Sequence, residues 1–240
     1  MAYLVKEKRG AKQYFYLHEK ISGRLVRTYL GTKTPLPDYV PWKGLAPETV
    51  LALKSKCPDT PDMPTGKYDI IYADPPWRYD FNVGSRATEN HYPTLTLKQI
   101  RTLRDKKGVH IQDKIESNAI LYLWATAPKL NEAMEVLKAW GFTYKTNMVW
   151  VKDKIGLGWY ARNQHELLLI GEKGEMPLPN NAVRPPSVLS FQRTTHSTKP
   201  LEMYSLLERW YPSRAYLEVF GTKNDVRPSS WGVFGNNVYK

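Results

Sequence analysis

The residues best suited to chemistry are Asp74, Pro75, Pro76 and Trp77, which directly follow the apolar run 68–73. That run predicts a strand, so the four residues should form the turn at its carboxyl end, where open α/β sheets bind ligands. Because the prolines fix φ and lack an N–H, the turn presents mainly hydrogen-bond acceptors. The Asp74 carboxylate and the Pro75 carbonyl could each accept one hydrogen of an aromatic amine such as that of adenine, while Trp77 stacks on the ring. The alternative interpretation is a strand-end turn with a buried tryptophan.

Two acceptors placed this way address the weak nucleophilicity of an exocyclic amine, whose lone pair is delocalised into its ring. Drawing electron density toward the nitrogen aligns the lone pair on an incoming methyl group and stabilises the positive charge that develops. The remaining requirement is an activated methyl group, which a sulfonium cofactor supplies. The pattern therefore indicates methyl transfer to an amine.

Further motifs follow this turn along the chain. They are Asn90-His91-Tyr92-Pro93-Thr94, Leu121-Tyr122-Leu123-Trp124, Val149-Trp150-Val151-Lys152, Arg162-Asn163-Gln164-His165-Glu166, His196-Ser197-Thr198-Lys199-Pro200, Leu217-Glu218-Val219-Phe220-Gly221 and Trp231-Gly232-Val233-Phe234-Gly235-Asn236. Over residues 67–237 the series resembles the adenine-N6 methyltransferase family that includes the catalytic subunit of the eukaryotic messenger-RNA enzyme and many bacterial and phage members. The resemblance implies S-adenosylmethionine as the cofactor and the N6 amine of adenine as the methyl acceptor.

The resemblance also assigns residues to the cofactor. Asp74 would face it, and Lys199, at the N-terminal edge of a helix, would reach its methionine carboxylate with help from the helix dipole. The strand end and turn beside the cofactor would be formed by Glu218, Phe220 and Gly221. Candidates for its ribose or adenine are Asn224, Asp225 and Asn236, since Asp and Asn suit hydroxyl recognition.

Ordinary structural roles are the alternatives for these residues. Lys199-Pro200 also reads as a plain helix start, and Asn224 and Asp225 as surface turns. Many family members place Arg after the Phe-Gly or Phe-Ala pair, where this chain has Thr222-Lys223. The ribose contacts are where this sequence departs from the family.

The methyl acceptor would meet a second group of residues. Trp77 would stack on the base, and Tyr92 would close over the base or over the methionine end of the cofactor. Asn163 and His165 would line the base pocket, or Arg162 would meet phosphate. The alternative is a loop anchor at Tyr92 and a polar strand entry at residues 162–166 whose side chains satisfy their neighbours.

Strands and helices must alternate to position these residues. Strands are predicted at residues 69–73, 119–124, 144–151, 166–170 and 215–220. Helices are predicted from Thr96 to Leu103, from Pro128 with an apolar face of Leu130, Ala133, Met134, Leu137 and Trp140 before Gly141, and from Pro200 with Met203, Leu206, Leu207 and Trp210. The alternation predicts a Rossmann-like α/β methyltransferase fold, a mostly parallel sheet with helices on both faces. The catalytic turn precedes the cofactor strand, as in circularly permuted amino-methyltransferases.

Three regions divide the chain: a small basic β-meander at residues 1–33, a linker with a short helix at 34–65, and the catalytic domain at 66–240. Residues 1–33 hold eight Lys or Arg and two Glu, which is +6 of the formal net charge of +12. Such an excess favours an anionic partner such as nucleic acid, although solubility is an equal explanation. A three-stranded sheet this small needs something to pack against.

The composition excludes several classes of protein. The single cysteine, Cys57, forms no internal disulfide, and no His or Cys spacing supports a metal site, so no metal is expected. No apolar run is long enough to span a bilayer, and the N-terminus lacks a signal-peptide pattern, so we expect no membrane contact and a cytoplasmic location.

The favoured prediction is a bacterial or phage enzyme that methylates adenine in DNA, since the chain is short, basic and without a recognisable RNA-binding module. The same reaction on RNA is the runner-up, because the base is identical. A non-catalytic nucleic-acid-binding subunit is a third interpretation, which the presence of Asp74, Trp77 and Lys199 disfavours. Relatives that methylate the cytosine amine or a glutamine side chain usually begin this turn with Ser or Asn, or end it with Tyr or Phe. A homodimer or a partner subunit stays open.

Overall fold

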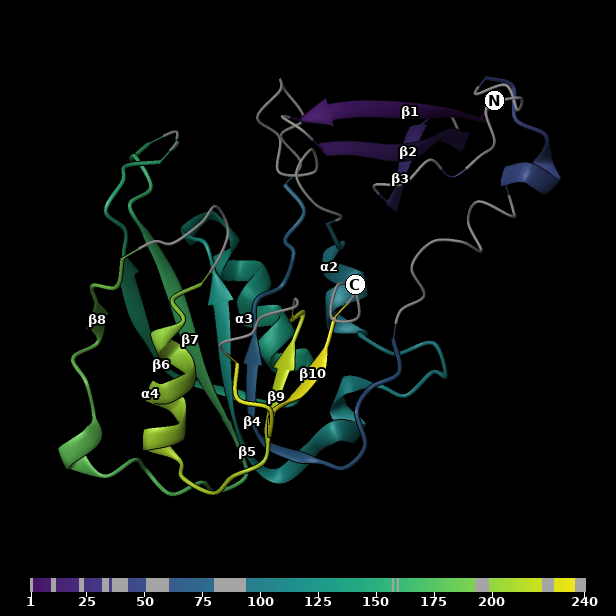
Figure 1. The fold of residues 1–240 in the computed structure, drawn as a ribbon. Coiled ribbons are helices and arrows are strands. Elements are labelled where there is room, and N and C mark those ends of the chain that lie inside the picture. Colours follow the sequence, from purple (N-terminus) through teal and green to yellow (C-terminus); the bar gives the residue numbers. More distant parts are fainter. Residues whose placement is uncertain are drawn as a thin grey trace. The chain divides into compact units, whose positions relative to one another are not determined.

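The computed structural model of the chain (Figure 1) describes residues 2–9, 12–21, 24–31, 35, 43–50, 61–79, 94–156, 158, 160–192, 199–221 and 227–235. They divide into two units, Met1–Thr60 and Pro61–Lys240.

The first unit is built on the predicted β-meander. Strands β1 (Ala2–Arg9), β2 (Lys12–Ile21) and β3 (Arg24–Gly31) pair antiparallel in that order. Leu4 and Leu17 lie opposite each other and pack against Leu45, whose N–H donates to the Ala2 carbonyl at 3.1 Å. Residues 47–50 form a helical turn. The segment 43–50 therefore packs on the small sheet and supplies the apolar cover that a three-stranded sheet needs.

The second unit contains a seven-stranded sheet in the order β10-β9-β4-β5-β7-β6-β8. Its strands are β4 (Tyr68–Ala73), β5 (Ile115–Ala125), β6 (Thr143–Val151), β7 (His165–Lys173), β8 (Val188–Leu189), β9 (Tyr216–Val219) and β10 (Gly232–Phe234). Within this sheet β7 is antiparallel to both of its neighbours, and the other adjacent pairs are parallel. The predicted mostly parallel sheet is confirmed.

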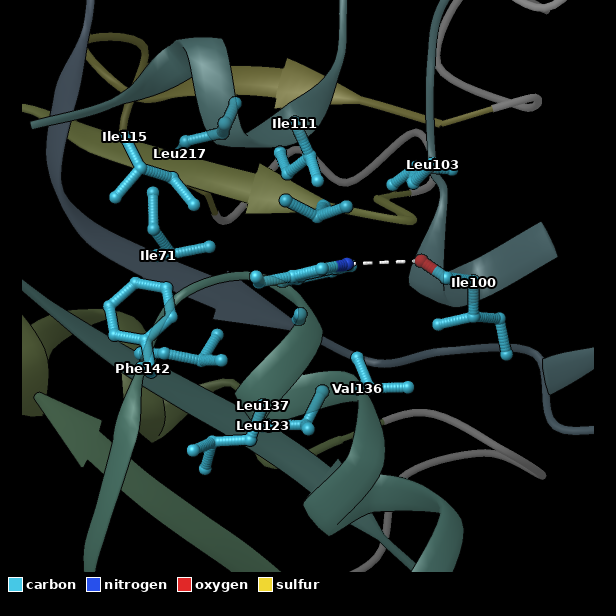
Figure 2. Close-up of a cluster of buried hydrophobic side chains, with 14 of the residues drawn as sticks. Ile71, Ile100, Leu103, Ile111, Ile115, Leu123, Val136, Leu137, Phe142 and Leu217 are labelled. Carbon is cyan, nitrogen blue, oxygen red and sulfur yellow. Dashed lines mark hydrogen bonds between the residues drawn. The ribbon is translucent and has the colours of Figure 1, made fainter. Parts of the chain in front are cut away.

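Alternate residues of the strands point to opposite faces, and each face is covered by a helix. Ile71 and Ala73 pack with helix α3 (Leu130–Ala139), whereas Ile70 and Tyr72 pack with helix α4 (Glu202–Trp210). Figure 2 shows the first of these clusters, in which the Trp140 Nε1–H donates to the Ile100 carbonyl at 3.0 Å. The predicted arrangement of helices on both faces is therefore confirmed.

The predicted helices are present, with one error in their buried faces. Thr96 caps α2 (Leu97–Arg101) through a capping box, and a 3₁₀ turn at Ala127–Lys129 leads into α3. Leu130 and Met134, predicted to belong to the buried face of α3, are 38% and 37% exposed, and Val136 is buried instead. The buried stripe is 133, 136, 137 and 140, which is the i, i+3, i+4, i+7 spacing of one helix face. Short 3₁₀ turns also occur at Ile111–Lys114 and Asn181–Val183.

The sheet topology gathers several chain segments at one edge. The parallel strands β4, β5, β6 and β9 all end there, and the reversed strand β7 begins there. Asp74, Lys152 and Phe220 follow three of the parallel strands, and Glu166 is the second residue of β7. Crossover topology therefore brings residues from distant parts of the chain to the edge where such sheets bind ligands.

Candidate active site

The turn that follows β4 is held by backbone hydrogen bonds. The Asp74 N–H donates to the Val219 carbonyl at 3.4 Å, and the Trp77 N–H donates to the Pro75 carbonyl at 2.8 Å. The Leu95 N–H donates to the Pro76 carbonyl at 2.9 Å. The Pro75 carbonyl, expected to serve a substrate amine, thus already accepts one internal bond and has one lone pair left.

Trp77 is part of the core. It is 6% exposed, and its Nε1–H donates to the Trp124 carbonyl at 3.2 Å. The indole therefore forms a fixed wall of the turn and offers little surface for stacking.

Asp74 ends a chain of four alternating charges that no single sequence motif contains. The Lys199 Nζ lies 2.7 Å from Asp74 Oδ1 and 3.2 Å from Glu166 Oε2, and the other oxygen of Glu166 contacts the Lys152 Nζ. The side chains of Lys199 and Glu166 are 15% and 11% exposed, whereas that of Asp74 is 36% exposed. Asp74 is thus the solvent-facing end of a mostly buried chain.

The pKa values follow from this arrangement. Burial raises the pKa of the Asp74 carboxyl, a shift that the Lys199 ammonium opposes and the Glu166 carboxylate reinforces. Burial alone would lower the pKa of Lys199, but the two carboxylates outweigh it and raise this pKa above its usual value. Burial alone would raise the pKa of Glu166, yet Lys199 and Lys152 hold it below its usual range. Lys199 and Glu166 are therefore both charged at neutral pH.

Tryptophans support both lysines. The Lys199 Nζ lies 5.7 Å from the centroid of the Trp124 ring, and the Lys152 Nζ lies 5.1 Å from that of Trp150. The two indoles meet edge to face at 6.0 Å, and the Trp124 Nε1–H donates to the Tyr72 hydroxyl at 2.8 Å. Cation–π contacts with buried rings help to fix the two ammonium groups.

The turn after β9 is too tight for most side chains. Phe220 has a φ of 66°, in the left-handed region. A Cβ added to Gly221 would lie 2.7 Å from Val233 Cγ1 and 3.1 Å from Glu218 Cδ. Position 221 therefore requires glycine, because the side chains of Val233 and Glu218 occupy the space that a Cβ would need.

Glu218 has partners that the sequence did not reveal. Its Oε1 accepts from the Tyr204 hydroxyl at 3.1 Å, and its Oε2 is paired with Arg227. Burial raises the pKa of the Glu218 carboxyl, and Arg227 opposes this shift. Arg227 lies six residues beyond Gly221, so the sequence offers no spacing that would link it to Glu218.

The remaining predicted site residues fall into two groups. Arg162 and Asn163 lie in the connection between β6 and β7, at the same edge of the sheet, where the Gly156 N–H donates to the Asn163 carbonyl at 2.8 Å, and His165 is the first residue of β7. Arg162 is exposed, and Asn163 and His165 are partly exposed. Tyr92, Asn224, Asp225 and Asn236 lie outside the described residues.

The described residues contain no group of three or more His, Cys, Asp or Glu side chains that could hold a metal ion. No helix among them is long and apolar enough to cross a membrane.

The sheet order, its single reversed strand and the acidic turn beyond β4 define the class as the Rossmann-like fold of S-adenosylmethionine-dependent methyltransferases. The MT-A70 family profile matches residues 68–237, and the chain belongs to this family. It is a methyltransferase, and the predicted resemblance is confirmed.

Relatives of two kinds share this region. The Type II methyltransferase M.MunI from Mycoplasma sp is 31% identical, with 72% of this chain and 80% of that protein covered. The human N(6)-adenosine-methyltransferase catalytic subunit METTL3 is 29% identical over 72% of this chain, and the chain spans 28% of its length. The N(6)-adenosine-methyltransferase MT-A70-like protein of Drosophila melanogaster is 28% identical, with 27% of its length spanned.

Proposed function

We propose that this protein transfers a methyl group from S-adenosylmethionine to the exocyclic N6 amine of adenine in DNA. The observation that carries the proposal is the Asp74 carboxylate, which stands at the ligand-binding edge with Oδ1 held by Lys199 and a third of its side chain exposed. A carboxylate fixed in this way can accept a hydrogen bond from the amine and stabilise the positive charge that forms on its nitrogen. The remaining lone pair of the Pro75 carbonyl is the second acceptor.

The cofactor fits the residues around this edge. Lys199 is a buried, charged ammonium just before helix α4 and suits the methionine carboxylate, while Phe220 and Gly221 form the tight turn that follows β9 at the same edge of the sheet. Glu218, held by Tyr204 and Arg227, is the acidic group beside that turn. We assign Asn224, Asp225 and Asn236 to the ribose and adenine on the family resemblance. When bound, S-adenosylmethionine supplies the activated methyl group.

The nucleic acid is proposed to lie along the same edge. Asp74 is reached from a duplex only by a flipped base, at a cost of a few kcal/mol. Trp77 would border the flipped adenine, and Tyr92 would close over it. Asn163 and His165, near the start of β7, would line the pocket of the base, and Arg162 would meet phosphate.

DNA is favoured over RNA by the extent of the similarity. A type II methyltransferase, a class defined by DNA substrates, shares most of its length with this chain, whereas the adenosine methyltransferases share about a quarter of theirs. RNA stays the second candidate because those adenosine methyltransferases match at nearly the same identity.

The N-terminal unit is proposed to contact the phosphate backbone. Lys6, Lys8 and Lys20 are exposed on its strands, and residues 1–33 carry a net charge of +6. Neutralising phosphates with such groups releases counterions, so binding should weaken steeply with salt. The proposal also divides the chain into this sheet, a linker and a catalytic domain. It places the protein in the cytoplasm of a bacterium or a phage host. It includes a homodimer or a partner subunit.

The test is a methyl-transfer assay with labelled S-adenosylmethionine on duplex DNA, single-stranded DNA and RNA, with nucleoside digestion and mass spectrometry. We expect N6-methyladenine in DNA, abolished by Asp74→Ala and retained by Glu175→Ala, an exposed acidic residue beyond the other end of β7. Product on RNA alone would shift the assignment to RNA. The absence of methyladenine from every polymer would contradict the proposal.

A further inference from the structure

Glu166 is a buried carboxylate for which the proposed reaction has no use. The residue as a whole is 8% exposed, and its two carboxylate oxygens are divided between two ammonium groups, those of Lys199 and Lys152. Burying a carboxylate is costly unless its oxygens are paired, and this one is fully paired. Its placement therefore has a structural cost that its partners must offset.

A second Lys–Glu pair across the same two strands shows what an ordinary pair looks like. Lys145 on β6 and Glu172 on β7 are 2.7 Å apart, and the lysine side chain is 53% exposed. That pair lies toward the opposite end of β7 and ends in solvent. The pair Lys152–Glu166 differs because it is buried and continues through Lys199 to Asp74.

The balance of charges around Lys199 explains what the link from Glu166 to Asp74 does. Lys199 faces Asp74 at 2.7 Å and Glu166 at 3.2 Å, so the ammonium is shared between two carboxylates. With Asp74 as its single charged partner, Lys199 would neutralise it more completely and weaken it as an acceptor for an amine hydrogen. Lys152 in turn limits how strongly Glu166 draws Lys199 away from Asp74.

We propose that Lys152 and Glu166 are positioning residues that set how far Lys199 neutralises Asp74. Neither residue touches the reacting atoms, and both act through Lys199. The inference rests on the proposed adenine methyl transfer. It says which residues control how strongly Asp74 accepts a hydrogen bond from the amine.

The test compares Glu166→Gln with Glu172→Gln, because both substitutions remove one β7 carboxylate from a Lys–Glu pair. We expect Glu166→Gln to lower kcat at least tenfold with little change in KM for DNA, and Glu172→Gln to stay within twofold of wild type. Calorimetry with S-adenosylhomocysteine should show binding to Glu166→Gln that is unchanged or tighter. Removing a negative charge near Lys199 does not weaken its attraction for a ligand carboxylate.

A double variant separates charge balance from loss of structure. Lys152→Met combined with Glu166→Gln restores the net charge and removes the repulsion between Lys152 and Lys199. Its kcat should therefore recover at least threefold relative to Glu166→Gln alone. Thermal unfolding of each variant, followed by circular dichroism, monitors the fold.

Two results would overturn the inference. One is a kcat of Glu166→Gln that matches Glu172→Gln. The other is a parallel loss of kcat and of S-adenosylhomocysteine affinity, as expected when the site merely loosens. If wild type methylates no adenine, the proposed function fails by itself. The calorimetry still decides on the pair, since binding that weakens more than tenfold in Glu166→Gln contradicts it and retained binding supports it.

Discussion

Replacing Tyr72 by Phe removes one hydroxyl from the core beneath the turn at residues 74–77. Tyr72 lies on β4, two residues before Asp74, and is 3% exposed. Its hydroxyl accepts the Nε1–H of Trp124, whose ring is fully buried and lies beneath the Lys199 ammonium. Burial raises the pKa of Tyr72 well above its usual value, so the hydroxyl is neutral at any working pH.

The expected loss of stability follows from the Trp124 N–H, which is left without an acceptor. Phe fills almost the same volume as Tyr, so the cavity contribution is small. The buried Trp124 N–H loses its acceptor, which costs about 1–3 kcal/mol. For a unit of 150–250 residues this lowers Tm by about 2–12 °C.

The assay is urea unfolding followed by tryptophan fluorescence. Tyr144→Phe is the matched control, since the Tyr144 hydroxyl accepts from Asn147 Nδ2 at 2.7 Å but the residue is partly exposed. Water can replace that lost acceptor, so the control should cost less than about 0.5 kcal/mol. A Tyr72→Phe variant no less stable than the control would refute the reasoning.

Further predictions concern other parts of the unit. Asp105→Asn should lower the free energy of unfolding by about 2 kcal/mol at neutral pH, because the Asp105 carboxylate accepts three backbone N–H groups. These bonds, opposing burial, hold the pKa of Asp105 below its usual value. Their stabilisation is therefore complete above about pH 4 and is lost as pH falls through the folded-state pKa, so the difference in urea midpoint should shrink by pH 3. Tyr160→Ala should raise KM for DNA about tenfold without changing affinity for S-adenosylhomocysteine, since the fully exposed ring lies on the β6–β7 hairpin and is free to stack on bases. Arg227→Met should weaken S-adenosylhomocysteine binding about tenfold in calorimetry, because Glu218 loses its charged partner.

Each of these predictions has a clear contrary outcome. A difference between Asp105→Asn and wild type that is constant from pH 7 to pH 3 would contradict the role of its charge. Leu178→Ala, which truncates another exposed apolar side chain, should leave KM for DNA unchanged, and an equal effect of Tyr160→Ala and Leu178→Ala would exclude stacking. Unchanged affinity in Arg227→Met would remove Glu218 from cofactor binding.

Local patterns in the sequence were enough to predict much of this fold. The apolar run before Asp74 specified β4, and Thr96 and Gly141 marked a helix start and a helix end that the structure confirms. These features depend on residues close in sequence, through side-chain periodicity, capping and the left-handed φ of 88° at Gly141. Strands β8 and β10, of two and three residues, were missed because so short a run carries no periodicity.

The order of the motifs identified the family but did not determine how exposed each residue is or which hydrogen bonds it makes. Trp77 was interpreted as a stacking surface and is largely a buried wall, and the Pro75 carbonyl already accepts one bond. The burial of Trp77 depends on its packing against Trp124 of another strand. The bond to the Pro75 carbonyl depends on the backbone conformation of the turn, which brings the Trp77 N–H close to it.

Sequence by itself therefore determined the class of protein, most of its helices and strands and the position of the Asp-Pro-Pro-Trp turn after β4, because those follow from local pattern and recurrent motifs. Tertiary structure alone decided the charge chain from Lys152 to Asp74 and the pairing of Arg227 with Glu218. Lys199 lies far from Asp74 and Glu166 in the sequence, and the three side chains meet because β4 ends and β7 begins at one edge of the sheet. Arg227 lies nine residues after Glu218, and the course of the chain beyond β9 brings the two together. Long-range ion pairs have no sequence period, so only the folded topology specifies them.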